Sequence, residues 1–232
     1  SAREPAVFTT ATMLLFMGDF AGYRKCRSLM REQFNVMTFN GVDAFLADQN
    51  SEAIAYFDTA TKDMKKKDIE EFVYVAKAYM NSDKHDYKTA LEYLNKAKAI
   101  NPTDALVQMT LGDAYYGEKN QNEAYAAYRN AFQTDATLIR AKMQLGVLLK
   151  GAKSYTEAVK AFDNVIAADA NYGPVYRELA ETYYYWGNNE PKKYNEYIQK
   201  ALSYYEKYMS LTDYSLTSRM RHADFLIFAK DY

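Results

Sequence analysis

The sequence predicts an all-α fold made of antiparallel helical hairpins stacked one after another. The main observation is a repeat: landmark residues of segment 105–138 return 34 positions later, so that Gly112 becomes Gly146 and Asp135 becomes Asp169. A fixed period of this length is typical of helical repeat architectures. The second observation is that all four prolines stand where a helix start or a loop is expected, the places that a mostly helical chain tolerates.

Composition and charge narrow the functional classes. The 232 residues are 49% hydrophobic and 25% charged, with a net charge of −1, so no general attraction to nucleic acid or anionic membranes is expected. No run approaches the roughly 20 apolar residues of a membrane span, and no membrane insertion is expected. The single cysteine, Cys26, excludes an internal disulfide.

The first part of the chain contains the less regular hairpins. Residues 1–33 are expected to form an N-terminal hairpin that is a degenerate repeat or a cap, because terminal repeats have one face in water. Clear repeats follow near 34–68 and 69–104. The second of these has two extra residues within the sequence SDKHDY, which predicts a longer loop. Asp104 then stands where an N-cap of the next helix is expected.

The second part contains two regular repeats and a modified one. Repeats are expected at about 105–138, 139–172 and 173–215. In the last of these, Ala201 follows Ala158 by 43 positions rather than 34, so nine residues have been inserted. We expect them to enlarge the turn and to extend the second helix at its start, to about 20 residues from Pro191, beyond the usual length. A final helix is expected at 216–230.

Small and large residues occupy recurring positions on the two helices of each unit. Gly112 and Gly146 on first helices, and alanines on second helices, predict close approach of the two helices within a hairpin. Large residues such as Tyr128 and Phe162 are expected to fill the space between hairpins. Each hairpin alone leaves an apolar face bare, and stacking buries that face.

Two segments carry a family resemblance: LGDAYY…NEAYAAYRNAFQTDA and LGVLLK…YTEAVKAFDNVIAADA resemble tetratricopeptide repeats (TPRs). The resemblance covers about 34–232. The usual closing proline is present only as Pro102, with Ala136 and Ala170 in its place elsewhere. The resemblance implies a right-handed α–α superhelix, a TPR solenoid, whose concave surface binds a peptide or protein segment. Most members of the family are not enzymes.

The resemblance also implies which side chains would contact a partner, since the first helix of each hairpin lines the groove in this family. The candidates that lie beside the small-residue seam are Leu106, Met109, Asp113, Tyr116, Arg140, Met143, Lys150, Arg177, Glu181, Tyr184 and Tyr185. Met adapts its shape, and Tyr offers both apolar area and a hydrogen bond, so this surface suits a peptide with apolar anchors. The alternative is that several of these residues pack against the neighbouring helix.

Other activities find little support. The Lys–Asn pair that would clamp the carboxylate of a chaperone tail is missing from the inward sites. His85 and His222 have no metal-ligand spacing, Cys26 has no nearby catalytic partner in sequence, and no glycine-rich phosphate loop occurs. We therefore expect no enzymatic activity, no cofactor and no metal. RNA binding is disfavoured by the near-zero charge.

Two alternatives to peptide binding stay open. In the first, the chain is a structural or self-assembly scaffold, a possible homodimer that uses the long 191–210 helix. In the second, it is the N-terminal part of a larger protein whose activity lies beyond Tyr232. The start at Ser1 and a resemblance to bacterial envelope repeat proteins favour an exported, periplasmic or cell-envelope location after leader removal, with the cytoplasm as the alternative.

Overall fold

The computed structural model describes residues 36–62 and 69–212, together with positions 220, 223, 226 and 227. The expected hairpin at 1–33 lies outside the described residues, as does nearly all of the expected helix at 216–230. The part of the chain that is described is helical and contains no strand. The predicted all-α class is therefore confirmed.

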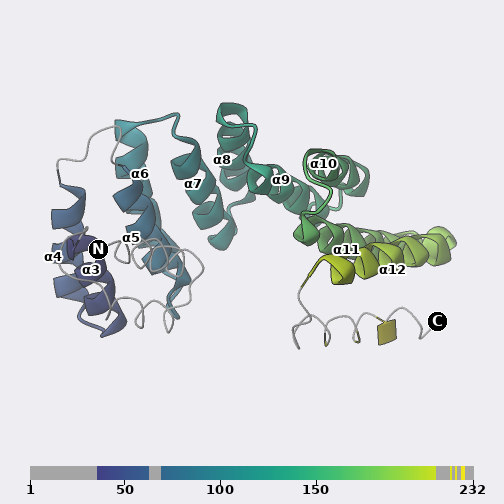
Figure 1. The fold of residues 1–232 in the computed structure, drawn as a ribbon, viewed down its shortest axis with the longest axis horizontal. Helices are drawn as coiled ribbons and strands as arrows, with labels where there is room; N and C mark the ends of the chain where they lie inside the picture. The colour runs from purple at the N-terminus through teal and green to yellow at the C-terminus, as the bar shows by residue number, and fades with distance from the viewer. Residues whose placement is uncertain (1–35, 63–68, 213–219, 221–222, 224–225, 228–232) are drawn as a thin grey trace, which may run out of the picture. The chain divides into compact units, whose positions relative to one another are not determined.

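The described helices form consecutive antiparallel pairs (Figure 1). The pairs are α3 (Val36–Leu46) with α4 (Asn50–Thr61), α5 (Glu70–Asn81) with α6 (Tyr87–Ile100), α7 (Ala105–Gly117) with α8 (Gln121–Thr134), α9 (Ile139–Gly151) with α10 (Tyr155–Ala168), and α11 (Gly173–Asn189) with α12 (Tyr194–Leu211). The chain divides into two compact units at residue 135, an N-terminal unit and a C-terminal unit.

Each unit has its own apolar core. In the N-terminal unit Phe57, Val73 and Leu94 are fully buried, and in the C-terminal unit Phe162 and Leu179 are fully buried. These residues come from both helices of their hairpins. Burial of each of these side chains stabilises its unit by roughly 2 kcal/mol.

Glycine sets the spacing of the helices within a hairpin. A Cβ atom at Gly112 of α7 would lie 2.4 Å from the ring of Tyr128 on α8, and one at Gly41 of α3 would lie 2.4 Å from the ring of Phe57 on α4. Only a hydrogen at these positions leaves room for the ring. The large residue of the second helix thus packs inside its own hairpin. Phe57 also meets Tyr79 of the next hairpin, at 5.5 Å between ring centroids.

The first four turns between paired helices share a left-handed residue. One non-glycine residue in each of the first four turns has a left-handed φ of 46–61°, namely Asp48, His85, Lys119 and Lys153. The backbone N–H of the next residue points back into the preceding helix in the regular turns: Asn120 donates to the Tyr115 carbonyl and Ser154 to the Leu149 carbonyl, both at 2.9 Å. This pattern satisfies carbonyls that the helix end leaves unpaired.

The two-residue insertion lies in a turn, as predicted. Residues 82–86 separate α5 from α6, whereas residues 118–120 separate α7 from α8. His85 stacks on Tyr87, at 6.0 Å between centroids, and its Nδ1 lies 3.0 Å from the Met80 carbonyl oxygen. These contacts hold His85 in the turn.

The nine-residue insertion is distributed differently from the expectation. The helix α11 has 17 residues where α9 has 13, and α12 has 18 where α10 has 14, with a 3₁₀ helix, η1 (Pro191–Lys193), between them. The expected lengthening of the second helix is confirmed, and the turn grows only from residues 152–154 to residues 190–193. The extension of α11 was not expected. α11 ends where Pro191 disfavours a helical residue before it, and Glu190 there has φ −125° and ψ 76°.

Candidate binding faces

The first helices of the hairpins present the predicted contact residues, and their starts are defined by local bonds. The Asp104 side chain accepts a hydrogen bond from the Val107 backbone N–H at 2.9 Å, so the predicted N-cap of α7 is confirmed. Gln108 adds a bond from its Nε2 to the Pro102 carbonyl at 2.7 Å. These bonds fix where α7 begins and therefore which of its side chains share a face.

The α5–α7 face of the N-terminal unit contains the predicted residues of α7. Lys77 of α5 forms an ion pair with Asp113 at 2.9 Å, and the hydroxyl of Tyr128 donates to the same carboxylate at 2.9 Å. Both ionic side chains are only 12% exposed. Asp113 is thus already paired inside the protein, and the large exposed side chain on this face is Tyr116, at 45%.

The α9–α11 face of the C-terminal unit is built around a compact charge cluster. Lys150 of α9 contacts the carboxylates of Glu178 and Glu181 on α11, each at 2.6 Å. Arg177 donates to Glu178 at 2.8 Å. We call these four side chains the α9–α11 cluster. It joins the first helices of two consecutive hairpins.

Burial and charge act against one another in the α9–α11 cluster. Burial alone would lower the pKa of Lys150, but Glu178 and Glu181 outweigh it and raise that pKa above its ordinary value. Burial alone would raise the pKa of Glu178, but Lys150 and Arg177 outweigh it and lower that pKa. The Lys150–Glu178 pair is therefore charged throughout the neutral pH range.

Glu178 was not among the predicted contact residues. Its side chain is 8% exposed and bonds to both cations of the cluster. It lies 28 positions from Lys150, on the side of α11 that carries the buried residues Val175 and Leu179. An acidic residue within an apolar stripe is the signal in the sequence that points to such a buried partner.

Arg177 uses little of its hydrogen-bonding capacity. A guanidinium carries several N–H donors and no acceptor, yet the bond to Glu178 is the one hydrogen bond that Arg177 makes in the part of the chain that the structure describes. Its Nε is buried and makes no hydrogen bond, but it forms an ion pair with Glu181 at 3.9 Å. The Arg177 side chain is nonetheless 30% exposed.

Tyrosines lie beside the cluster at the end of the α9–α11 face. Tyr184 and Tyr185 are in edge-to-face contact, at 5.6 Å between centroids. Tyr185 is 48% exposed, and its carbonyl accepts a bond from Asn189. Large aromatic surface open to solvent on this face is suited to contact with another chain.

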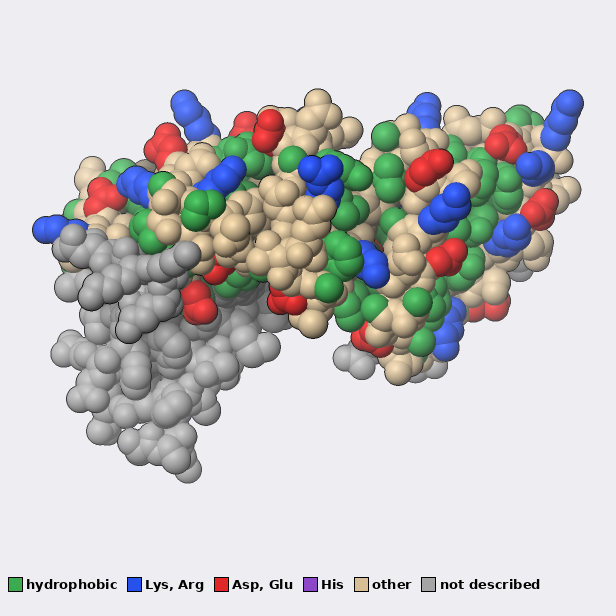
Figure 2. All heavy atoms as spheres, turned by 90° about the horizontal axis from the view of Figure 1, so that it is seen from above, with side chains coloured by type: hydrophobic (Ala, Val, Ile, Leu, Met, Phe, Trp, Pro, Cys, Tyr) green, Lys and Arg blue, Asp and Glu red, His purple; other side chains and the backbone are tan. Residues whose placement is uncertain are grey.

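The remaining predicted residues differ in accessibility. Met109 and Met143 are only 4% and 7% exposed, so they contribute packing rather than contact area, which corrects their assignment as contact residues. Leu106 is half-buried, and Arg140 is exposed. Positive and negative side chains alternate over the visible surface of each unit (Figure 2).

Metal binding, membrane insertion and surface pockets are the remaining features of the described residues. No three His, Cys, Asp or Glu side chains within the described ranges gather closely enough to hold a metal ion. Among the described helices, none is both long and apolar enough to cross a membrane. A shallow pocket of about 390 Å³ lies between the start of α10 and the end of α11, lined by Tyr155, Glu157, Trp186 and Asn189 among others.

The paired helices, the glycine-set spacing and the first-helix faces define a helical-repeat scaffold. The family model described as tetratricopeptide repeat matches residues 73–104, which comprise most of α5 and all of α6. Residues 73–104 are thus similar to a tetratricopeptide repeat. A comparison with curated proteins finds no match to the chain.

Several solved structures of tetratricopeptide repeat proteins share the fold of this chain. TTC0263, a thermophilic TPR protein of Thermus thermophilus, is 19% identical with a TM-score of 0.61, over 82% of this chain and 97% of that one. The MamA protein is 19% identical with a TM-score of 0.58, over 78% and 96%. YrrB, described as a TPR protein with an unusual peptide-binding site, is 18% identical with a TM-score of 0.56, over 81% and 91%.

Proposed function

We propose that this protein is a non-enzymatic scaffold that binds a peptide or protein segment, and that the α9–α11 face is its principal contact surface. The observation that carries this proposal is the exposed ring of Tyr185, next to Tyr184, on a first helix. Tyrosine is enriched at protein interfaces because it combines a large apolar ring with a polar tip. Tyr116 gives the α5–α7 face a smaller contact area of the same kind.

The charges on these faces favour a partner held mainly by apolar contacts. Lys150, Glu178 and Glu181 already bond to one another, as do Lys77 and Asp113. A partner that recruited these groups would have to break buried ion pairs, which costs more than an exposed pair returns. We therefore expect a segment with apolar or aromatic anchors, bound with only modest dependence on ionic strength.

Family-level observations agree with a binding role. Tetratricopeptide repeat proteins are generally non-catalytic scaffolds, and YrrB, which has the same fold, is described as having a peptide-binding site. The homodimer and the cell-envelope location expected from the sequence stay predictions.

Selection of random peptides displayed on phage, with the full chain as bait, tests this function. The proposal expects enrichment of peptides with apolar or aromatic anchors, and loss of these peptides when Tyr184→Ala and Tyr185→Ala are combined. Tyr125→Ala is the matched control, because Tyr125 on α8 is 40% exposed but lies on a second helix. Failure to enrich any peptide, or equal capture by the double variant, contradicts the proposal.

A further inference from the structure

We propose that the pocket between the start of α10 and the end of α11 takes a lysine or arginine side chain of the segment bound at the α9–α11 face. This inference rests on the proposed function and narrows it to segments with a basic side chain next to their apolar anchors. We call this site the α10–α11 pocket. Its volume of about 390 Å³ is near the lower end of the roughly 300–1,000 Å³ of ligand sites, which suits one long side chain.

The extension of α11 forms one wall of the α10–α11 pocket. Gly151, the last residue of α9, corresponds to Tyr185 at the 34-residue period, but α11 continues to Asn189. Trp186 and Asn189 line the pocket, and both belong to this added part of α11. The indole of Trp186 stacks on the ring of Tyr155, the first residue of α10. The insertion therefore places a wall beside the first turn of α10.

The corresponding corner of the N-terminal unit is closed in a different way. Tyr87 of α6 stands two 34-residue periods before Tyr155, and α7 ends at Gly117. A Cβ atom at Gly117 would collide with the ring of Tyr87, so that ring lies directly against the end of the helix. In the C-terminal unit Tyr155 lies against the extension of α11 instead. The pocket is therefore a product of the insertion rather than of the repeat.

The α10–α11 pocket adjoins the proposed contact surface. The side-chain amide of Asn189 donates to the Tyr155 hydroxyl at 2.9 Å and to the Tyr185 carbonyl at 2.7 Å. Burial raises the pKa of the Tyr155 phenol, and Tyr185 adds to that rise because the two phenols lie near each other. A segment anchored on Tyr185 therefore reaches the pocket with a neighbouring side chain.

Carboxylates give the pocket its negative charge. The lining contains Glu157, Glu190 and Lys153, which are two negative charges and one positive. The Trp186 indole N–H donates to the Glu190 carboxylate at 2.7 Å and holds it in place. The pair of Glu190 with Lys193, at 3.5 Å, is exposed at both ends and therefore weak. Within the part of the chain that the structure describes, Glu157 makes no hydrogen bond or ion pair.

A basic side chain matches this lining better than an acidic one. Ammonium and guanidinium groups have only donors, and the two carboxylates supply acceptors for them. The aliphatic stem of Lys or Arg can cover apolar surface while the charged end stays among polar groups, which suits a lining of aromatic rings and carboxylates. An acidic side chain would approach Glu157 and Glu190, and like charges brought together across an interface reduce affinity.

Peptide selection followed by a double-mutant cycle tests the inference. Peptides enriched on the full chain are expected to carry Lys or Arg next to their apolar anchors. One such peptide is synthesised in a Lys form and a Gln form, acetylated and amidated so that its chain ends are uncharged. Each Kd is measured for the full-length wild type and for Glu157→Gln. We expect the wild type to bind the Lys form about fivefold more tightly, and Glu157→Gln to prefer it by less than about twofold.

Glu123→Gln is the matched control. Glu123 occupies the same position in the first turn of α8, one 34-residue period before Glu157. The control removes the same charge from the same place in a helix, and should leave the fivefold preference intact. Equal binding of both peptide forms by the wild type overturns the inference. A preference that Glu157→Gln retains, or that both variants lose alike, also overturns it.

The selection separates this inference from the proposed function. Enrichment of peptides that lack Lys and Arg, and that the Tyr184→Ala/Tyr185→Ala variant does not capture, overturns the basic-side-chain site and leaves the contact surface standing. Selection of no peptide at all overturns both proposals.

Discussion

Phe162 on α10 packs so closely on Gly146 of α9 that a Cβ atom at position 146 would lie 2.5 Å from its Cε1. Phe162 is fully buried in the core of the C-terminal unit. The ring cannot swing away without opening a void, because protein interiors are close-packed. The contact therefore fixes the distance between the two helices of this hairpin.

Gly146→Ala should destabilise the C-terminal unit. Overpacking typically costs about 1–3 kcal/mol and outweighs the roughly 1 kcal/mol that Ala gains over Gly in a helix. Urea unfolding followed by the fluorescence of Trp186, the single tryptophan of the chain, reports on this unit. Gly151→Ala in the same helix is the control: no atom lies within 4 Å of its added Cβ, so it should be neutral or stabilising. Equal destabilisation by both variants would contradict the packing argument.

Lys150→Met should also destabilise the C-terminal unit, because it removes one of the two cations that bond to the buried carboxylate of Glu178. Arg177 remains as a partner, so we expect about 2 kcal/mol rather than the full cost of orphaning a buried charge. The free energy of unfolding from urea titration measures the effect. Lys153→Met, at an exposed turn position, should change stability by less than about 0.5 kcal/mol. A Lys150→Met variant as stable as the control would show that the ion pairs are not needed.

Glu178 should make stability depend on acid pH. Its pKa is lowered in the folded protein from an ordinary value of 4.5, so the unfolded chain binds the proton more readily. This stabilisation is present above pH 4.5 and is lost as the pH falls through the lower folded-state value. Glu178→Gln should therefore flatten the acid limb of the unfolding free energy plotted against pH. An unchanged acid limb in the variant would mean that other carboxylates account for it.

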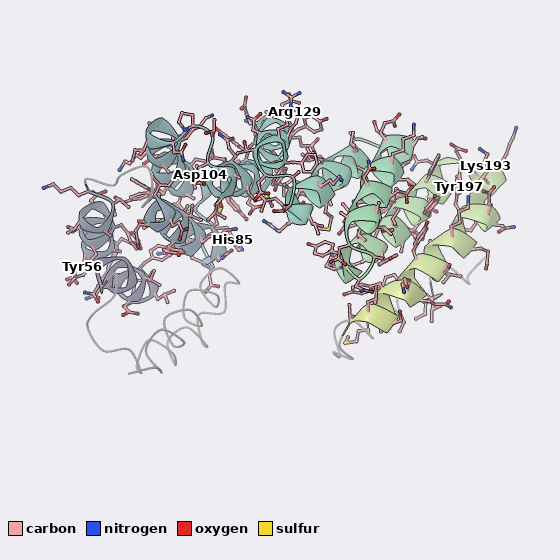
Figure 3. All side chains as sticks on the ribbon, turned by 45° about the horizontal axis from the view of Figure 1, so that its top comes forward. Tyr56, His85, Asp104, Arg129, Lys193 and Tyr197 are labelled. Carbon is pink, nitrogen blue, oxygen red and sulfur yellow. The ribbon has the colours of Figure 1, made fainter. Side chains whose placement is uncertain are left out.

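Trp186→Ala should weaken the junction of α11 with α12. The indole stacks on Tyr197 of α12, at 4.6 Å between centroids, and on Tyr155 of α10, at 5.9 Å. Lys193 of η1 lies over the far end of this stack, 5.8 Å from the Tyr197 centroid (Figure 3). Loss of a large aromatic side chain from such a site costs about 3 kcal/mol.

Thermal unfolding followed by circular dichroism measures this change, since the variant has no tryptophan. Tyr125→Ala, an exposed aromatic on α8, should leave the melting temperature nearly unchanged. A Trp186→Ala variant that melts with the wild type would show that the insertion is held by other contacts.

Features set by local chemistry could be predicted from the sequence. Asp104 caps α7 because a carboxylate at that position meets free backbone N–H groups within three residues. The two-residue insertion at 82–86 lies in a turn because the apolar period continues unbroken on both sides of it. Glycine at 112 and 146 indicated close helix approach, and the rings of Tyr128 and Phe162 occupy that space.

Features set by the relation between helices could not be predicted in this way. The pairing of Glu178 with Lys150 depends on how α11 lies against α9, 28 residues earlier. The helix α11 extends to Asn189, and within the added part Trp186 stacks on Tyr197, a contact between two helices. Met109 and Met143 follow the period expected for contact residues, but both are buried.

The most direct test of the account is the Kd of one selected, amidated peptide for three full-length proteins: wild type, Tyr184→Ala/Tyr185→Ala, and Tyr125→Ala. Loss of two aromatic contacts at the centre of an interface costs at least about 2 kcal/mol, which corresponds to a Kd roughly 30-fold higher. The account predicts that increase for the double variant and wild-type affinity for Tyr125→Ala. Equal affinity of all three proteins would contradict the assignment of the α9–α11 face as the binding surface.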